Sequence, residues 1–283
     1  MKKITVILLF TVVLFSHNVF AQSATEADAL IKGKIDLIYQ AIKSGEVNTP
    51  IDGYTPMQIA ARWATDTKII NDLVKAGADI HFQPKVGWPA VFVAAMDNPN
   101  PDIIKAFIDA GVDINTCDST GEPLLAYAFS NSSNKIAIAL IKLGADVNAR
   151  SPKAKTLLME ALDPEIFQLL LRSGADVNAR DSDGSTVLMQ IAGRKNVTDR
   201  VLKTIVEAGA DVNAVDKNGC TALMYAADRI DFTAAKTVYA LRSLGAKVEI
   251  KDKNGKTALD HAKANDTLIG SHVYTLLEEA LNR

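Results

Sequence analysis

One five-residue phrase recurs along the chain at a nearly constant interval, and this period limits the fold more than any other feature. The phrase is Gly-Ala-Asp-Val-Asn or a close variant. Its copies begin at Gly77, Gly111, Gly144, Gly174, Gly209 and Gly245. Successive copies are 30 to 36 residues apart. Such a period indicates a repeat protein, in which each unit buries its apolar face only by stacking on its neighbours.

A second phrase, threonine followed by apolar and small residues, lies between the copies of the first. It occupies residues 55–61, 156–159, 186–189, 221–227 and 257–262. The threonine can cap a short inner helix, and Pro56 suits the first helical position. Amphipathic runs such as 166–171 and 201–206 predict a second, outer helix. Glycine then ends the outer helix, and Asp-x-x-Gly stretches such as 181–184 and 216–219 predict a hairpin.

Together the two phrases resemble the ankyrin repeat, whose period is about 33 residues and whose signature contains T-P-L-H-x-A. The resemblance covers roughly residues 50–263. It implies an all-α solenoid of helix-turn-helix units joined by β-hairpin-like loops. Two departures matter. Proline replaces the capping threonine at Pro89 and Pro123, and the signature histidine is replaced by Gln58, Phe92, Ala126, Met159, Met189, Met224 and Asp260. The hydrogen bonds of that histidine therefore do not carry over from the resemblance.

The resemblance and the N-terminus together predict four segments. Residues 1–21 read as a signal peptide, with basic Lys2 and Lys3, an apolar stretch at 4–15 and a small-residue cleavage site ending at Ala21. The alternative, a membrane anchor, is disfavoured because polar residues interrupt the run at 16–18. Residues 22–49 are an N-terminal capping half-repeat, 50–255 are six ankyrin repeats, and 256–283 are a C-terminal capping repeat. The mature chain is thus expected to be exported. The periplasm is the favoured location, and secretion into the medium is the alternative.

Charge and cysteine content exclude some partners and cross-links. The formal net charge is −2, and loss of Lys2 and Lys3 with the signal peptide makes it more negative, so neither nucleic acid nor, after cleavage, a membrane is expected as a partner. Cys117 and Cys220 lie three repeats apart, on the order of 30 Å if layers are about 10 Å apart. A disulfide needs Cα atoms within about 7 Å, so no intramolecular bridge is expected. The chain is also expected to be a monomer.

No catalytic, cofactor-binding or metal-binding motif is found in the sequence. The mature chain has His81, His261 and His272, with no His-Glu-x-x-His, paired Cys-x-x-Cys or phosphate-binding glycine loop. We therefore expect no enzyme activity, no cofactor and no metal.

The repeat ending at Gly174 is the shortest, which predicts a local irregularity or an ordinary loop deletion.

The resemblance implies partner binding through the hairpin tips and the inner helices, which line a concave face. Candidate partner-binding residues at these positions are Tyr54, Arg62, Trp63, Trp88, Met96, Arg194, Lys217, Arg229 and Lys253. Trp, Tyr and Arg are enriched in binding hot spots. The alternatives are that the tryptophans pack within the scaffold and that the basic residues form a solvated rim.

The sequence thus predicts a non-catalytic interaction scaffold that binds another protein in the periplasm or outside the cell. The partner would be an enzyme that it inhibits, a toxin that it neutralises, or an exported enzyme that it stabilises. The alternative is a secreted effector that binds a host protein.

Overall fold

The structure is a computed structural model of the whole chain. It describes residues 24–84, 87–129, 131, 134–161, 163–195, 197–229, 231, 233–264 and 272–281. The expected signal peptide, residues 1–21, therefore lies outside the described residues. The chain forms two compact units, Met1–Ala94 and Ala95–Arg283. Within the described ranges, no helix combines the length and the apolar composition that a membrane span needs.

Short helices alternate along both units. The first unit contains α2 (Ala24–Ser44), α3 (Pro56–Trp63) and α4 (Lys68–Lys75), and the unit boundary falls within α5 (Ala90–Asp97). The second unit continues with α6 (Pro101–Asp109), α7 (Leu124–Ala128), α8 (Lys135–Lys142), α9 (Leu157–Glu160), α10 (Pro164–Arg172), α11 (Val187–Ala192), α12 (Asp199–Glu207), α13 (Ala222–Ala227), α14 (Ala234–Ser243), α15 (Ala258–Ala264) and α16 (His272–Leu281).

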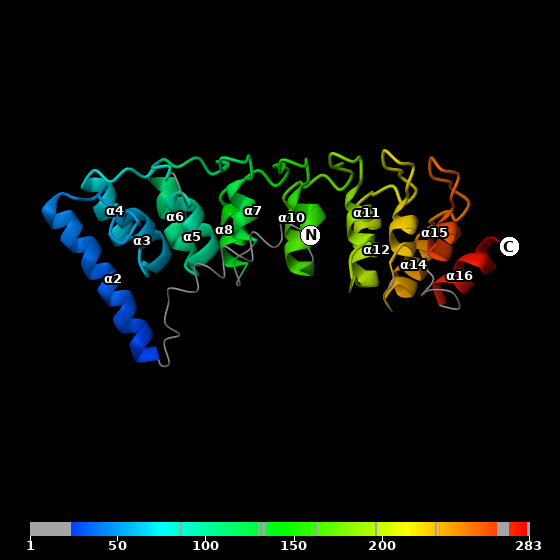
Figure 1. Ribbon diagram of the computed structural model, residues 1–283, viewed down its shortest axis with the longest axis horizontal. Coiled ribbons are helices and arrows are strands. Elements are labelled where there is room, and N and C mark those ends of the chain that lie inside the picture. Colours follow the sequence, from blue (N-terminus) through cyan, green and yellow to red (C-terminus); the bar gives the residue numbers. More distant parts are fainter. Residues whose placement is uncertain are drawn as a thin grey trace. The chain divides into compact units, whose positions relative to one another are not determined.

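In the second unit, inner and outer helices alternate and each pair packs on the next. Inner helix α11 contacts both α9 and α13, and α13 contacts α15, while outer helix α12 contacts α14. The loops that join successive pairs project along one edge of this unit, at the top of Figure 1. The described residues contain isolated antiparallel bridges, such as Arg180 with Thr186, instead of longer strands. The all-α repeat class predicted from the sequence is confirmed.

Stacking rather than a central core buries the apolar side chains. Inner-helix residues Leu124, Leu158, Leu188 and Leu223 are fully buried, as are outer-helix residues such as Leu202. An isolated helix pair would leave these side chains in water, so repeat-to-repeat interfaces supply the burial.

The threonine caps that the sequence predicts are formed at several inner helices. The backbone N–H of Gln58 donates to the Thr55 hydroxyl over 3.2 Å, and the N–H of Thr55 donates to Gln58 Oε1 over 2.8 Å. Asp260 accepts from the N–H of Thr257 in the same way, over 2.9 Å. Other residue types thus make part of the cap at the position of the absent histidine.

The repeat that ends at Gly174 departs from this pattern. Its inner helix α9 has only four residues, and Thr156 makes no side-chain cap. The Thr156 hydroxyl is buried without a hydrogen-bond partner in the described structure. Outer helix α10 instead has a strong cap, since Asp163 accepts from the N–H groups of Glu165 and Ile166.

The recurring asparagine of the first phrase explains why that phrase is repeated. Asn148 donates from Nδ2 to the carbonyl of Gly174 over 3.0 Å and accepts from the N–H of Asp176 over 2.8 Å. Asn213 makes the same pair of bonds to Gly245 and Lys247, over 3.1 and 2.8 Å. Each asparagine therefore ties one hairpin to the helix end of the next repeat.

Glycine is required where successive hairpins touch. Gly219 has a φ of +81°, and a Cβ there would lie 3.0 Å from the backbone nitrogen of Lys253. The same nitrogen donates to the carbonyl of Asn218 over 2.8 Å. The second unit thus orders its hairpins by direct backbone contact, which positions the side chains around them.

Candidate functional site

A recurring aspartate connects four hairpins of the second unit to the inner helices that follow them. In four repeats an aspartate accepts from, or pairs with, the side chain nine residues later. These pairs are Asp118–Tyr127 at 2.7 Å, Asp181–Gln190 at 2.9 Å, Asp216–Tyr225 at 2.9 Å and Asp252–His261 at 3.3 Å. We call Tyr127, Gln190, Tyr225 and His261 the inner row.

The two oxygens of each aspartate have different partners. Asp216 accepts the backbone N–H groups of Asn218 and Cys220 on Oδ1, over 2.7 and 2.8 Å, and the Tyr225 hydroxyl on Oδ2. Burial, together with the bond to Asp216, raises the pKa of Tyr225 to about 12. The tyrosine therefore remains a donor at neutral pH, and one carboxylate fixes both the hairpin and the inner helix.

The residue directly before the inner-helix cap, here called the pre-cap residue, reaches the inner row of the next repeat. Lys155 Nζ donates to Gln190 Oε1 over 3.2 Å, and the Ser185 hydroxyl lies 2.9 Å from that of Tyr225. Each junction therefore joins three positions: a pre-cap residue and, from the next repeat, a hairpin aspartate and an inner-row residue. The three junctions are Lys155–Asp181–Gln190, Ser185–Asp216–Tyr225 and Cys220–Asp252–His261.

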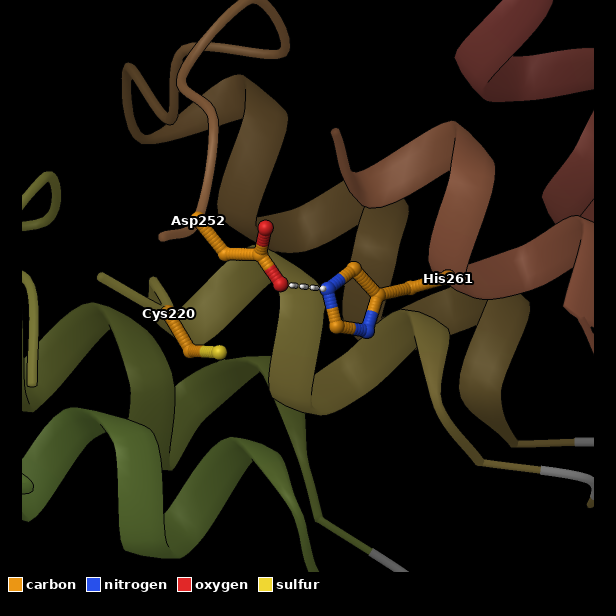
Figure 2. Close-up of side chains that lie close together, drawn as sticks. All are labelled: Cys220, Asp252 and His261. Carbon is orange, nitrogen blue, oxygen red and sulfur yellow. Dashed lines mark hydrogen bonds and ion pairs between the residues drawn. The ribbon is translucent and has the colours of Figure 1, made fainter. Parts of the chain in front are cut away.

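The third junction brings together the side chains of a thiol, a carboxylate and an imidazole. The ligand atoms of Cys220, Asp252 and His261 all lie within 4.8 Å of one another. Figure 2 shows the Cys220 sulfur directed toward the pair formed by Asp252 and His261. On its other side the imidazole Nδ1 lies 2.9 Å from Asp228 Oδ1. Both Cys117 and Cys220 are free thiols in this structure.

The predicted residues of the first unit fall into two groups. Tyr54 and Trp88 are pre-cap residues of consecutive repeats, and Tyr54 is 41% exposed. Trp88 is half-buried; its ring lies 6.3 Å from that of Phe92, and its carbonyl accepts from Gln58 Nε2 over 2.7 Å.

Arg62 and Trp63 lie at the other end of the same inner helix and are half-buried. The eight residues of α3 separate them from Tyr54 by about 12 Å along the helix. The structure therefore places Tyr54 and Trp88 at equivalent positions of consecutive repeats, and Arg62 and Trp63 at the other end of α3.

Three of the predicted residues of the second unit keep some exposure. Met96 is half-buried on α5, and Lys217 and Lys253 are exposed on successive hairpins. Lys217 Nζ donates to the carbonyl of Ser182 over 2.9 Å, so this lysine also connects two hairpins.

Arg194 and Arg229 act inside the scaffold, which the sequence did not suggest. Arg229 is only 7% exposed, and its Nη1 donates to the carbonyl of Ala192 over 3.3 Å. Arg194 is half-buried, and its Nη1 donates to the carbonyl of Glu160 over 2.8 Å. Ala192 and Glu160 are the last residues of the preceding inner helices, whose carbonyls lack helical partners and carry the negative end of the helix dipole.

Each arginine thus clamps the end of the previous repeat. Asn131 does the same in an earlier repeat, since its Nδ2 donates to the carbonyls of Ala95 and Asn98 over 3.3 and 3.1 Å. These residues stand eight positions after the residue that caps their inner helix. That spacing, compared between repeats, was the available signal for the clamps, as the spacing of nine was for the aspartate pairs.

Comparisons with known proteins agree with the architecture. A family model for ankyrin repeats (3 copies) matches residues 57–151 and 157–252. The solved structure of an ankyrin repeat domain from Acinetobacter baumannii AYE aligns with a TM-score of 0.57 at 29% identity, covering 67% of this chain and 96% of that one.

Two curated relatives share the repeats over part of their length. The E3 ubiquitin-protein ligase KEG of Arabidopsis thaliana is 27% identical over 146 residues, which are 50% of this chain and 9% of the ligase. The human ankyrin repeat and SOCS box protein 6 is 32% identical over 99 residues, 34% of this chain and 23% of that protein. The chain thus spans less than a quarter of either relative. Since the family model covers more than half of the sequence and the repeat contacts are those described above, the chain belongs to the ankyrin-repeat family.

Proposed function

We propose that this protein is a non-catalytic scaffold that binds an exported partner protein, in the periplasm or after secretion, through its pre-cap residues and hairpins. The observation that carries the proposal is the contrast between recurring positions. The recurring glycines have positive φ, and the recurring asparagines and aspartates make hydrogen bonds within the scaffold. The pre-cap position instead changes chemistry from repeat to repeat: Tyr54, Trp88, Glu122, Lys155, Ser185, Cys220 and Lys256.

Tyr54 and Trp88 are the proposed anchors of the partner. Both are large side chains at equivalent positions of consecutive repeats, and the bond from Gln58 to the Trp88 carbonyl holds the second repeat against the first. A rigid aromatic side chain loses little conformational entropy on binding, which makes it an effective hot spot. Trp63 and Arg62 of the first unit and Met96, Lys217 and Lys253 of the second unit are proposed as further contacts, whereas Arg194 and Arg229 support the scaffold.

The partner proposed here is a protein of the same compartment: an enzyme that is inhibited or stabilised, or a toxin that is neutralised. Standard interfaces bury about 800 Å² on each partner.

The test is capture of partners on immobilised residues 22–283 from an extract of the native cells, followed by identification and purification of the bound protein. The affinity of the purified pair is then measured for the wild type and for Tyr54→Ala/Trp88→Ala. Removing two hot-spot aromatics, each contributing about 2 kcal/mol or more, should weaken binding by a factor on the order of 100 or more.

The matched control is Tyr239→Ala, which removes a tyrosine that is 63% exposed on outer helix α14. This control should bind as the wild type does. Equal affinity of the double variant and the control would refute the anchor assignment.

Export has a separate test. N-terminal sequencing of the protein from its native cells should give Gln22 as the first residue. Mature protein in the periplasmic fraction would support the leading proposal, and mature protein in the medium with affinity for a host protein would support the alternative of a secreted effector. An intact Met1 would refute export.

A further inference from the structure

We propose that Cys220, Asp252 and His261 bind a divalent transition-metal ion, with zinc as the best match, at the junction between two repeats. The three ligands come from separate elements. Cys220 precedes the cap of α13, Asp252 opens the next hairpin, and His261 lies on α15. A metal held there would cross-link consecutive repeats through side chains that the scaffold already brings together (Figure 2).

The distances fit tetrahedral coordination by a small ion. Zinc–nitrogen and zinc–oxygen bonds of about 2.0 Å at tetrahedral angles place the two ligand atoms about 3.3 Å apart. His261 Nε2 and Asp252 Oδ2 lie 3.3 Å apart. A zinc–sulfur bond of about 2.3 Å places the sulfur about 3.6 Å from either atom. Since the three ligand atoms lie within 4.8 Å of one another, a side-chain movement of about 1 Å would complete the site.

The orientation of the imidazole gives a second, independent argument. Asp228 Oδ1 can only accept, so Nδ1 of His261 donates to it over 2.9 Å. With Nδ1 held this way, Nε2 faces Asp252 Oδ2 over 3.3 Å. A metal ion bound by both atoms satisfies both. A carboxylate behind a metal-binding histidine is also the usual arrangement that fixes its orientation.

The hydrogen bonds of Asp252 also orient its carboxylate for metal binding. Its Oδ1 accepts the backbone N–H groups of Asn254 and Lys256, each over 2.8 Å, which leaves Oδ2 for the metal. The side chain of Asp252 is only 3% exposed.

The other two junctions have the same arrangement of three positions, occupied by different side chains. Lys155–Asp181–Gln190 and Ser185–Asp216–Tyr225 use the same three positions for ordinary hydrogen bonds. In the third junction, and in no other of the three, each position carries a metal-ligating type: sulfur, nitrogen and oxygen. This mixed set suits zinc or a similar transition metal, whereas calcium and magnesium prefer oxygen alone.

Binding through Cys220 requires that its thiol lose a proton. Burial, followed by the charges of Asp216, Asp252 and Asp228, raises the pKa of Cys220 to about 11. The free thiol is therefore neutral, and on binding its proton passes to solvent as the sulfur–metal bond forms. Three protein ligands leave the fourth position to a water molecule.

The experiment uses residues 22–283 with Cys117→Ser, treated with a chelator and then titrated with Co²⁺ and Zn²⁺. We expect one ion per chain, a sulfur-to-cobalt charge-transfer absorption, and displacement of cobalt by zinc but not by Mg²⁺. Cys220→Ala should abolish that absorption, and Cys220→Ala and His261→Ala should each weaken zinc binding by a factor on the order of 100 or more. Asp228→Asn should weaken it about 10- to 100-fold.

Ser185→Ala, at the matched position of the preceding junction, should bind as the parent does, and circular dichroism verifies that each variant is folded. Asp252 is left unchanged because it also holds its hairpin. The proposal would be overturned by the absence of stoichiometric binding to the folded parent. It would equally be overturned by zinc affinity that Cys220→Ala and His261→Ala leave unchanged, and in either case a doubly paired imidazolium would explain the geometry.

Discussion

Replacing Arg229 with alanine tests whether this side chain is a clamp inside the scaffold. Its guanidinium is paired with Asp231 through Nη2 and Nε, over 2.7 and 2.9 Å, and Nη1 donates to the Thr237 hydroxyl over 3.0 Å. The same Nη1 reaches the carbonyl of Ala192 in the preceding repeat. One side chain therefore joins two repeats and anchors the start of α14.

The expected loss follows from the groups left behind. The Ala192 carbonyl loses a buried donor, which costs about 1–3 kcal/mol. Asp231, whose side chain is 19% exposed, regains part of its solvation when the arginine is removed. Leaving it unpaired therefore destabilises the protein less than leaving a fully buried carboxylate unpaired. Thr237 keeps its own bond to the carbonyl of Thr233. With the lost packing of the arginine side-chain methylenes included, we expect the free energy of unfolding to fall by about 3 kcal/mol.

The assay is urea unfolding of residues 22–283, followed by far-ultraviolet circular dichroism. Arg194→Ala is the matched control, because Arg194 makes the same kind of bond, to the Glu160 carbonyl, but is half-buried and has no ion pair among the described residues. It should cost only about 1 kcal/mol. A loss of unfolding free energy below about 1 kcal/mol for Arg229→Ala, or equal losses for the two variants, would refute the structural role of Arg229. Arg229 would then again be a candidate partner-binding residue.

The pH dependence gives the same test a second readout. The hydrogen bond from Arg229 holds the pKa of Asp231 well below its usual range. A group whose pKa is depressed by folding stabilises the protein above its unfolded pKa, about 3.9, and this contribution is lost as pH falls through the lower folded value. Below about pH 4 the stability of the wild type should therefore decline more steeply than that of Arg229→Ala.

Three further substitutions test the contacts between and within repeats by the same unfolding assay. Asn148→Ala removes two bonds to the next repeat and should cost about 1–2 kcal/mol; no loss would mean that water replaces them. Gly219→Ala should cost more than Gly77→Ala, since both have positive φ but only at Gly219 would a Cβ meet the backbone of Lys253; equal losses would contradict this contact. Thr156→Val should be neutral or stabilising by up to about 1 kcal/mol, because the buried hydroxyl has no partner in the described structure; a clear loss would reveal one.

The sequence predicted the parts of the fold that backbone geometry dictates. Glycine at the helix ends has positive φ, as at Gly209 with +97°, and few other residues tolerate this conformation. Threonine caps recur at several inner helices because a helix start has N–H groups without helical partners. Periodic backbone requirements produce periodic residues, and these were sufficient to identify the class.

The candidate site was harder to predict because it depends on contacts between repeats. Arg229 and Lys217 are both basic residues near turns, yet one is buried and the other exposed. The difference lies in whether the side chain points to the carbonyls of the preceding repeat. A single repeat sequence does not contain that information, whereas aligning the repeats on their caps places Asn131, Arg194 and Arg229 at one position.

The hydrogen bonds at the junctions also determine which pre-cap residues can contribute binding energy to a partner. Lys155 and Ser185 are pre-cap residues, but each already bonds to the next inner row, and a partner would have to replace those bonds. Tyr54 keeps a large exposed apolar area, and covering it adds burial without breaking such a bond. The aromatic pre-cap residues should therefore dominate affinity, while substitutions at Lys155 or Ser185 should act on stability at least as much as on binding.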